Sequence, residues 1–518
     1  MSENNELPRG WVNSKLEDIC TIIMGQSPPS SEYNENAKGL PFFQGKAEFS
    51  DLFPEIRKWC TAPTKIAEAN DILLSVRAPV GPTNLAPSLC CIGRGLAAIR
   101  PAKDIPVRYV LYAIRAFNSN LTQLGTGTTF DAISGDDVRA FEIPLAPFAE
   151  QHRIVAAIEQ QFTRLDAGIA ALRQVRAKLK RYRASVLKAA VEGKLTEAWR
   201  AEHPATEPAS VLLERILKER RTKWEADLRA KGKDPAKVRY VEPAKPDTAN
   251  LPVLLEEWCW ATMEELASPE PRSIQSGPFG SALLHSEFQE SGILAIGIDN
   301  VLDGGFSMGS QHRISPKKYE DLRKFTARPL DILITVMATV GRCCVVPADL
   351  ETAIITKHVY RISANQTAIS PYFLMLCFNG GSEVRRQLFG QVQGQTRPGI
   401  NGEILRRIAI PLPSLSEQKQ IIAEVQQWLS VVIDLEAVLE ANLKRAERLR
   451  QSILREAFAG RLVPQDPNDE PASVLLERIR GERKGRTAGN GRYVSVPEPV
   501  KIDAKRVQQE ELWEGAGN

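Results

Sequence analysis

The sequence predicts two mixed α/β (α+β) globular domains in tandem, separated by two long antiparallel helices that form a coiled coil. One segment occurs twice, 267 residues apart, as residues 150–193 and residues 417–460. Each copy has apolar residues at steps of three and four, which is the pattern of a coiled-coil seam. Similar segments recur on both sides of these two stretches, so we predict an internal two-fold repeat.

Each long helix is expected to begin after prolines and to end before a glycine, Gly193 or Gly460. A helix of about 43 residues is roughly 65 Å long, too long for the interior of one domain, so we expect the two helices to pack on each other. The predicted seam is Ile154, Ile158, Phe162, Leu165, Ile169, Leu172, Val175, Leu179, Tyr182 and Val186 in the first helix, and Ile421, Val425, Leu429, Val432, Leu435, Leu439, Leu443, Ala446, Leu449 and Ile453 in the second.

Short β-branched runs predict strands in both globular parts, and amphipathic runs predict short helices. The predicted strands are 71–76, 96–99, 293–298, 331–336 and 358–362. The predicted helices are 107–118 and 371–378, with helix starts at 134–138 and 401–405. We expect four segments: a first globular domain (1–148), a central spacer helix and connection (149–250), a second globular domain (251–413), and a distal spacer helix with a C-terminal tail (414–518).

The composition is that of an ordinary folded chain, with 43% hydrophobic and 25% charged residues. The sequence has no run of eighteen apolar residues and no signal-like start, which predicts a cytoplasmic protein without a membrane span. Eight cysteines form no CxxC motif and are accompanied by five histidines. We therefore expect reduced, buried cysteines and no metal site.

Motifs of the common catalytic sites are absent from the sequence. It has no aromatic-ended N/D-P-P motif for amino methylation, no dinucleotide-binding glycine pattern opening a helix, and no complete phosphate-binding loop. Metalloprotease, serine hydrolase and kinase motifs are missing as well. We predict no catalytic residue and no cofactor in this chain, and two duplicated modules on a helical spacer favour a binder with two heads.

Several motifs resemble those of the specificity subunits of type I restriction–modification systems. The stretches EIPLAPFAEQHRIVAAIE (142–159) and IPLPSLSEQKQIIAEV (410–425) are similar to that family's signature before the spacer helices. The segments LPRGW, MGQSPPSSEYN, FFQGKAEF and SGPFGSALL are typical of its target-recognition domains, and VLKAAVEGKLTEAWR is typical of the close of the central spacer. The second copy departs from the pattern because it opens with LEEW, at residues 255–258, in place of LPxGW.

This resemblance implies a DNA-binding protein without catalytic activity. Each target-recognition domain would bind one half of an interrupted double-stranded DNA sequence, and the helices would set the spacing. The partners would be two modification subunits, which carry S-adenosylmethionine and methylate adenine at N6. Restriction subunits, with ATP and Mg, would translocate and cleave DNA.

Candidate base-reading residues are polar or basic and stand beside glycines, where the backbone can approach DNA. Arg or Lys can address guanine, and Asn or Gln can address adenine. Each of these residues could also be an ordinary surface or turn residue. The candidates are Gln44, Lys46, Arg77, Arg94, Thr128 and Thr129 in the first domain, and Asp299, Asn300, Arg342, Lys357, His358, Gln395 and Arg397 in the second.

Both long helices also carry clusters of basic residues. The main ones are Arg173, Arg176, Lys180, Arg183, Lys444, Arg445 and Arg448. They could form a solvated face, attract DNA phosphates between the half-sites, or contact a modification subunit. The S-x-x-D spacing of Ser134 and Asp137 predicts a helix cap, as does Asn401 at the equivalent place, although a helix start can also hold a phosphate.

Two other classes of protein fit parts of the sequence. A scaffold that joins two protein partners would use the same modules and strut without DNA specificity. An enzyme with an unrecognised site would also show no known motif. Salt-dependent binding to duplex DNA would distinguish the DNA reader from the scaffold.

Overall fold

The computed structural model describes residues 7–124, 132–204, 207–309, 311–390 and 400–489. The chain divides into two compact units. Unit 1 consists of Met1–Leu172 and Ala441–Asn518, and unit 2 consists of Arg173–Glu440. Both long helices contribute to both units, because the unit boundaries fall inside them.

The strands of unit 1 form one pair and two sheets. The first strand pairs antiparallel with the strand before the first long helix: β1 (Val12–Lys15) with β11 (Glu142–Leu145). An antiparallel sheet has the order β2 (Cys20–Met24), β10 (Leu96–Pro101), β7 (Ile72–Ser75), β8 (Thr83–Leu85). A second sheet has the order β3 (Tyr33–Asn34), β5 (Trp59–Cys60), β4 (Leu40–Phe43), β9 (Cys90–Ile92), β6 (Ile66–Ala67), with β4 and β9 parallel.

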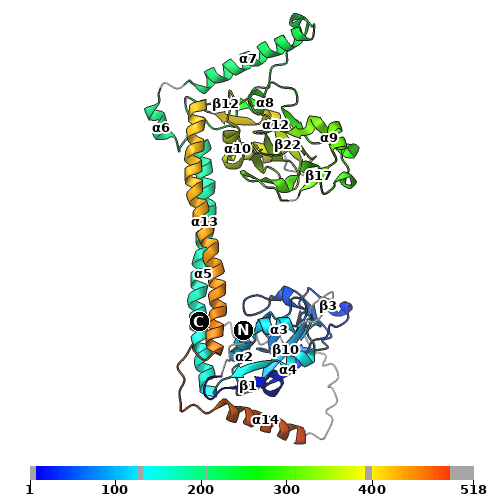
Figure 1. Ribbon diagram of the computed structural model, residues 1–518, viewed down its shortest axis with the longest axis vertical. Helices are drawn as coiled ribbons and strands as arrows, with labels where there is room; N and C mark the ends of the chain where they lie inside the picture. Colours follow the sequence, from blue (N-terminus) through cyan, green and yellow to red (C-terminus); the bar gives the residue numbers. More distant parts are fainter. Residues whose placement is uncertain (1–6, 125–131, 205–206, 310, 391–399, 490–518) are drawn as a thin grey trace. The chain divides into compact units, whose positions relative to one another are not determined.

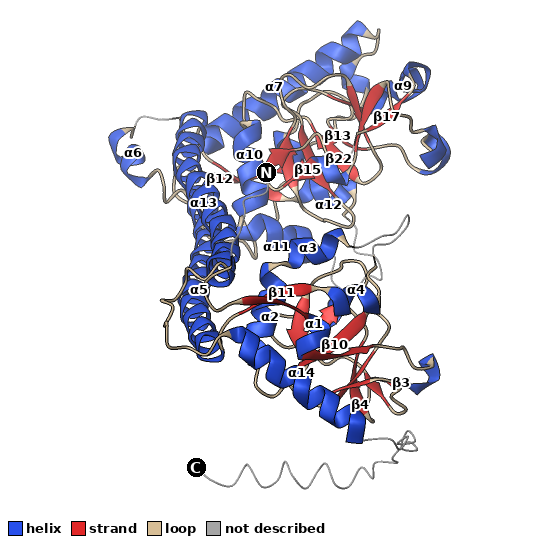
Figure 2. Ribbon diagram, turned by 60° about the horizontal axis from the view of Figure 1, so that its bottom comes forward, coloured by secondary structure: helices blue, strands red, loops and turns tan. Residues whose placement is uncertain are grey.

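The helices of unit 1 cover its antiparallel sheet and bury one core (Figure 2). They are α1 (Leu16–Ile19), α2 (Val107–Ala116), α3 (Asn118–Gln123), α4 (Gly135–Ala140), α14 (Ala472–Gly489), and parts of α5 (Phe148–Val191) and α13 (Leu415–Phe458). In the core, Tyr109 of α2 contacts Phe458 of α13, with 5.2 Å between ring centroids. The core therefore joins the sheet to the long helices.

Unit 2 repeats this arrangement with different details. Its pair is β12 (Cys259–Thr262) with β23 (Ala409–Leu412), and its antiparallel sheet has the order β13 (Ile274–Ser276), β22 (Val359–Ile362), β19 (Ile332–Thr335), β20 (Cys343–Val345). A second sheet has the order β17 (His312–Ile314), β14 (Ile293–Ile296), β21 (Ala353–Ile355), β18 (Thr326–Ala327). A hairpin joins β15 (Val301–Leu302) to β16 (Gly305–Phe306).

The helices of unit 2 include α6 (Glu197–Glu202), α7 (Ala209–Ala230), α8 (Met263–Leu266), α9 (Pro316–Leu322), α10 (Pro371–Gly380), α11 (Ser382–Gly390) and α12 (Gly402–Arg407).

All predicted strands and short helices are confirmed, with ends shifted by at most two residues. The mixed α/β class is confirmed as well. Seven of the eight cysteines are buried, and none of the eight is in a disulfide.

The two long helices, α5 and α13, each have 44 residues (Figure 1). Each ends in a left-handed glycine, Gly193 (φ 69°) or Gly460 (φ 70°), as predicted. The following amide then bonds to a carbonyl of the last turn: Lys194 N to Ala189 O and Arg461 N to Glu456 O, both at 2.9 Å. Glycine adopts this conformation without a steric penalty, so it ends both helices.

The helices run antiparallel along each other inside unit 2. Arg176 forms an ion pair with Glu440 at 3.0 Å, and Tyr182 contacts Trp428 with 6.5 Å between ring centroids. The contact partners on α13 thus have lower residue numbers as one moves to higher residue numbers on α5, which shows that the two helices run in opposite directions. In unit 1, Arg450 of α13 pairs with Asp166 of α5 and lies 4.8 Å above the ring of Phe162.

The predicted seam is wrong at four positions. Val175, Tyr182, Leu435 and Leu449 are between 42% and 49% exposed. Residues seven apart are buried on α13, namely Val425, Val432, Leu439 and Ala446. Between them, Leu429 and Leu443 are half-buried as predicted, but Glu436 and Arg450 are half-buried in place of Leu435 and Leu449. Long charged side chains can bury their stems at such positions, which an apolar pattern does not reveal.

A tryptophan fixes the opening of each unit to the first turn of its long helix. Trp11 donates its indole N–H to Glu150 Oε2 at 3.0 Å, and Trp258 donates to Glu417 Oε2 at 2.8 Å. Both carboxylates are buried. The same turn precedes both tryptophans, because LEEW folds like LPRGW: Trp258 N bonds to Leu255 O as Trp11 N bonds to Pro8 O.

The two buried carboxylates differ in their remaining partners. Glu417 Oε1 accepts hydrogen bonds from Arg200 Nη1 at 2.5 Å and from Thr196 Oγ1 at 2.8 Å. Glu150 Oε1 has no hydrogen-bond partner in the described part of the chain. Burial raises the pKa of the Glu150 carboxyl above its usual value. The charge on Glu150 is therefore poorly compensated, whereas that on Glu417 is matched.

This difference predicts opposite effects for the same substitution. Glu417→Gln should destabilise unit 2 by about 3 kcal/mol, because it leaves the half-buried Arg200 guanidinium without its carboxylate. Glu150→Gln should leave unit 1 equally or more stable at pH 7. Because the pKa of Glu150 is raised, protonation of its carboxyl stabilises the folded wild-type unit at low pH. The free energy of unfolding of wild-type unit 1 should therefore fall as the pH rises. In Glu150→Gln, which has no carboxyl at this position, this part of the pH dependence should be absent. Denaturant unfolding at several pH values measures both effects, and hydrogen exchange identifies the unit that unfolds. If Glu150→Gln loses as much stability as Glu417→Gln, the account is contradicted.

Candidate nucleic-acid interface

In unit 1, three loops meet where strand β7 ends. Ser75 N bonds to Pro82 O at 2.8 Å on one side, and Val76 N bonds to Gly95 O at 3.0 Å on the other. Arg77 follows directly and forms an isolated bridge with Ala132. Backbone hydrogen bonds thus hold the loop that carries Arg77 beside the loop that carries Gly95.

A tight turn between β9 and β10 presents Arg94. Leu96 N bonds to Gly93 O at 3.0 Å, which places Arg94 at the second position of the turn. Gly93 N bonds to Phe43 O at 2.8 Å, so Gln44 lies beside the turn. A Cβ on Gly95 would lie 2.4 Å from Gln44 O, and only glycine allows this approach. The structure therefore brings Gln44, Arg77 and Arg94 to one edge of the sheet.

Unit 2 has the same turn with a lysine. Val359 N bonds to Thr356 O at 3.0 Å, so Lys357 occupies the position of Arg94. Thr356 N bonds to Ile296 O, and Val336 N bonds to His358 O, both at 3.0 Å. The equivalent two segments therefore bond to the turn in both units. The cation is present in both turns, while the other residues of the turn differ.

The cations at these loops are available to an anionic ligand. Lys46, Arg77, Arg94, Arg342 and Lys357 have no ion-pair partner within the residues that the structure describes. Burial and the charge of Lys357 lower the pKa of His358, so its imidazole is neutral at pH 7. A neutral imidazole offers one donor and one acceptor, while the cations can bind phosphates or guanine.

The other predicted residues have varied environments. Lys46 and Asp299 are exposed on single helical turns, η2 (Lys46–Glu48) and η6 (Ile298–Asn300). Arg342 is half-buried beside Thr335, whose amide bonds to Arg342 O at 2.9 Å. The predicted contacts Thr128, Thr129, Gln395 and Arg397 lie outside the described residues.

Asn300 needs a correction, because its side chain stabilises a turn. It is 1% exposed, its Oδ1 accepts from Gly297 N, and its Nδ2 donates to Ser307 O, both at 2.9 Å. Glu48 bonds to Gly45 N at 3.2 Å in the equivalent turn of unit 1. A polar residue beside glycine can therefore be a cap, and we exclude Asn300 from the candidate contacts.

The predicted helix caps are confirmed. Ser134 Oγ accepts from Asp137 N at 3.2 Å, and Ser134 N donates to Asp137 Oδ2 at 2.7 Å. Ser134 Oγ also donates to Asp137 Oδ2 at 2.6 Å, and the hydrogen bonds that Ser134 Oγ and Ser134 N donate to this carboxylate lower the pKa of Asp137. Asn401 Oδ1 accepts from Ile404 N at 2.9 Å. The cap side chains are thus engaged within the chain.

Most predicted basic residues of the long helices are on the surface. Arg173, Lys180, Lys444, Arg445 and Arg448 are exposed, and Arg183 is half-buried. Arg176 is also exposed, but its guanidinium pairs with Glu440. The structure therefore assigns Arg176 a contact between the helices.

Two features of this surface were missed at the level of sequence. Ser27 lies under the turn of unit 1, where its Oγ accepts from Arg94 N at 3.2 Å. Its position close after Gly25 is the sequence feature that could have identified it as a candidate contact. An apolar stripe in unit 2 consists of the exposed Val175, Tyr182, Trp428, Val431 and Leu435. Val175, Tyr182 and Leu435 were expected in the seam between the helices and are instead exposed.

The described part of the chain shows neither a bilayer-spanning helix nor a metal-binding cluster. No helix there has the length and apolar content needed to cross a membrane. No group of three or more His, Cys, Asp or Glu side chains among the described residues is placed to hold a metal ion.

The comparisons with known proteins agree on one family. The profile described as "Type I restriction modification DNA specificity domain" matches residues 8–181 and 302–445. A putative type I restriction enzyme MjaX specificity subunit from Methanocaldococcus jannaschii is 38% identical over 38% of this chain and 45% of its own length. The EcoBI specificity subunit of Escherichia coli is 23% identical over 91% of this chain and 92% of its own length.

The chain also shares its fold with a solved structure. It comes from work on complex assembly and conformational transition of the type I R-M system. Its chain is 20% identical to this one, with a TM-score of 0.55, over 88% of this chain and 99% of that chain.

The glycine beside the turn of unit 1 provides a test of the local geometry. A Cβ on Gly25 would lie 2.2 Å from Gly93 O and 2.7 Å from Leu96 O, so Gly25→Ala must displace the turn that carries Arg94. We expect a loss of about 1–3 kcal/mol in stability and faster hydrogen exchange at residues 93–96. Gly45→Ala is the control, because no atom lies within 4 Å of the place that its Cβ would take and its φ is not positive; its stability should change by less than about 0.5 kcal/mol. Equal behaviour of the two variants would contradict this geometry.

Proposed function

This chain belongs to the family of type I restriction–modification DNA specificity subunits, and we propose that each of its units reads one half of an interrupted double-stranded DNA target. It is a recognition subunit and performs no catalytic step itself. The observation that carries the proposal is the basic turn, with Arg94 in unit 1 and Lys357 in unit 2, presented by the same backbone bonds.

The differences around these two turns support separate half-sites. In unit 1, Gln44, Arg77 and Ser27 adjoin the turn that carries the cation, and Lys46 follows Gln44 on η2. In unit 2, His358 belongs to the turn itself, Arg342 bonds to Thr335 next to Val336, and Asp299 follows Ile296 on η6. A shared cation suits a phosphate or guanine in either half, while different polar neighbours suit different bases. We propose residues 1–148 and 251–413 as the two target-recognition domains.

We propose that residues 149–250 and 414–518 supply the spacer, the connection and the tail, and that α5 and α13 act as a coiled-coil spacer. Inter-helix contacts within each unit support this role, as do the equal lengths of the helices. Exposed basic residues along the helices, including Arg173, Lys180 and Lys444, would attract phosphates of the unread gap.

The partners would be two modification subunits, together with restriction subunits. S-adenosylmethionine would bind to the modification subunits, and ATP and Mg to the restriction subunits. The apolar stripe of unit 2 supports a protein partner on the long helices, because an exposed row of Trp, Tyr and aliphatic side chains is typical of interfaces. Arg183 would lie at the polar margin of such contacts. In unit 1, the exposed Arg445 and Arg448 would contact phosphates or a modification subunit.

Expression of the chain with the modification subunit of its own system tests this function. Mapping of methylated adenines should give a target with two specific parts and a fixed unspecified gap. Arg94→Ala should relax only one part, Lys357→Ala only the other, and each should lower the salt slope of DNA binding by about one. Lys38→Ala, at an exposed residue away from the turn, is the control. Salt-insensitive binding of protein partners without DNA affinity would favour a scaffold and contradict the proposal.

A further inference from the structure

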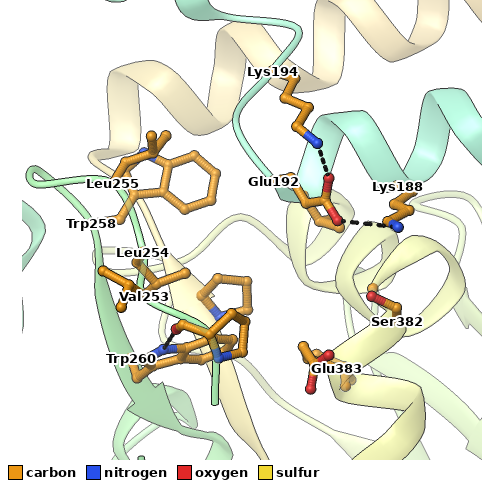
Figure 3. A pocket seen from close by; sticks show the side chains of 15 residues that line it. Lys188, Glu192, Lys194, Val253, Leu254, Leu255, Trp258, Trp260, Ser382 and Glu383 are labelled. Atoms are coloured by element: carbon orange, nitrogen blue, oxygen red, sulfur yellow. Dashed lines mark hydrogen bonds and ion pairs between the residues drawn. The ribbon is translucent and has the colours of Figure 1, made fainter.

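Unit 2 contains an apolar cavity of about 450 Å³ beside the end of α5 (Figure 3). Its walls include Val191, Leu254, Trp258, Trp260, Val384 and Pro411. Gly381, which follows α10, completes one side. This volume is within the range of pockets that bind small ligands or side chains.

The internal repeat explains why the cavity exists. Val191 aligns with Phe458, because residues 186–195 repeat as 453–462. Gly381 aligns with Phe117, since Gly381 N bonds to Cys377 O at 3.0 Å as Phe117 N bonds to Ala113 O at 3.1 Å. Both residues of unit 2 are therefore smaller than their counterparts in unit 1.

Aromatic rings fill the equivalent place in unit 1. The rings of Phe117 and Phe458 meet edge to face, with 6.2 Å between centroids, and Phe458 also contacts Tyr109. In unit 2 the counterpart of Tyr109 is Phe373, whose ring is 6.3 Å from that of Trp258. Trp258, which Phe373 contacts, lines the cavity, and Val191 and Gly381 line it where unit 1 has the rings of Phe458 and Phe117.

We propose that this cavity receives one aromatic side chain of a modification subunit, at unit 2 and not at unit 1. The inference rests on the proposed function. An aromatic ring fits because the same fold position already accepts rings in unit 1, where edge-to-face contacts stabilise them.

The surroundings of the cavity indicate a protein as the source of the ring. Val253 at the rim is 99% exposed, and Pro252 beside it is exposed as well. Lys188, Glu192, Lys194 and Glu383 surround the apolar walls with charges of both signs. An apolar centre within a charged rim is the usual composition of a protein interface, and a small ligand would leave the rim uncovered. The two modification subunits therefore bind unequally.

The test fills the cavity with the residue that unit 1 uses. Val191→Phe should weaken one of the two binding steps of the modification subunit by about tenfold or more and leave the other unchanged. Native mass spectrometry and titration calorimetry separate the two steps. Val211→Phe is the matched control, because Val211 is an exposed valine of the same unit; both of its steps should remain as in the wild type.

Indole, the ring of tryptophan, is the direct probe of the cavity. It should raise the thermal unfolding temperature of the wild-type chain and have less effect on Val191→Phe. Val191→Leu serves as a milder filling variant if Val191→Phe folds poorly, and should weaken the same step. Two results would overturn the inference. In the first, a variant that is folded and no longer responds to indole binds both modification subunits as the wild type does. In the second, the variant weakens both binding steps equally. Failure of the wild-type chain to bind any modification subunit would instead overturn the proposed function.

Discussion

The structure depends on a buried hydrogen bond between a tryptophan and a glutamate, which occurs once in each unit. Trp11 bonds to Glu150 and Trp258 bonds to Glu417. Each bond fixes the opening turn of a unit to the first turn of a long helix, and β1 with β11, or β12 with β23, pairs beside it. Both ends of a globular domain are therefore joined to the first turn of the same long helix. This constraint supports the proposed role of α5 and α13 as a spacer.

The same frame serves both units while their side chains diverge. Helix α14 begins where Ala472 N bonds to Gly10 O, and α7 begins where Ala209 N bonds to Glu257 O. The basic turn keeps its backbone bonds and its cation in both units. The units differ in the side chains next to this turn. They also differ in the partners of the buried carboxylate, Glu150 or Glu417, and in the packing around the equivalent residues Phe458 and Val191. Shared backbone geometry with variable side chains is what two different half-sites require.

The sequence alone predicted both long helices with their glycine ends and the strands of the central sheets, because these depend on local periodicity and turn chemistry. It misplaced Leu435 and Leu449, since the inward positions next to them are taken by Glu436 and Arg450. It also misjudged Asn300, whose role depends on bonds to Gly297 and Ser307. Side-chain bonds between distant segments, such as Arg200 with Glu417, follow from the tertiary fold and leave no local pattern.

The most direct test of the spacer changes both helices together. Four residues inserted after Leu172 and four after Leu439 lengthen each helix by roughly 6 Å and rotate the rest of the helix by about 40°. With the modification subunit present, methylation mapping should show both half-sites unchanged and the gap wider by one or two base pairs, given about 3.4 Å per base pair. An active variant with an unchanged gap would contradict the account.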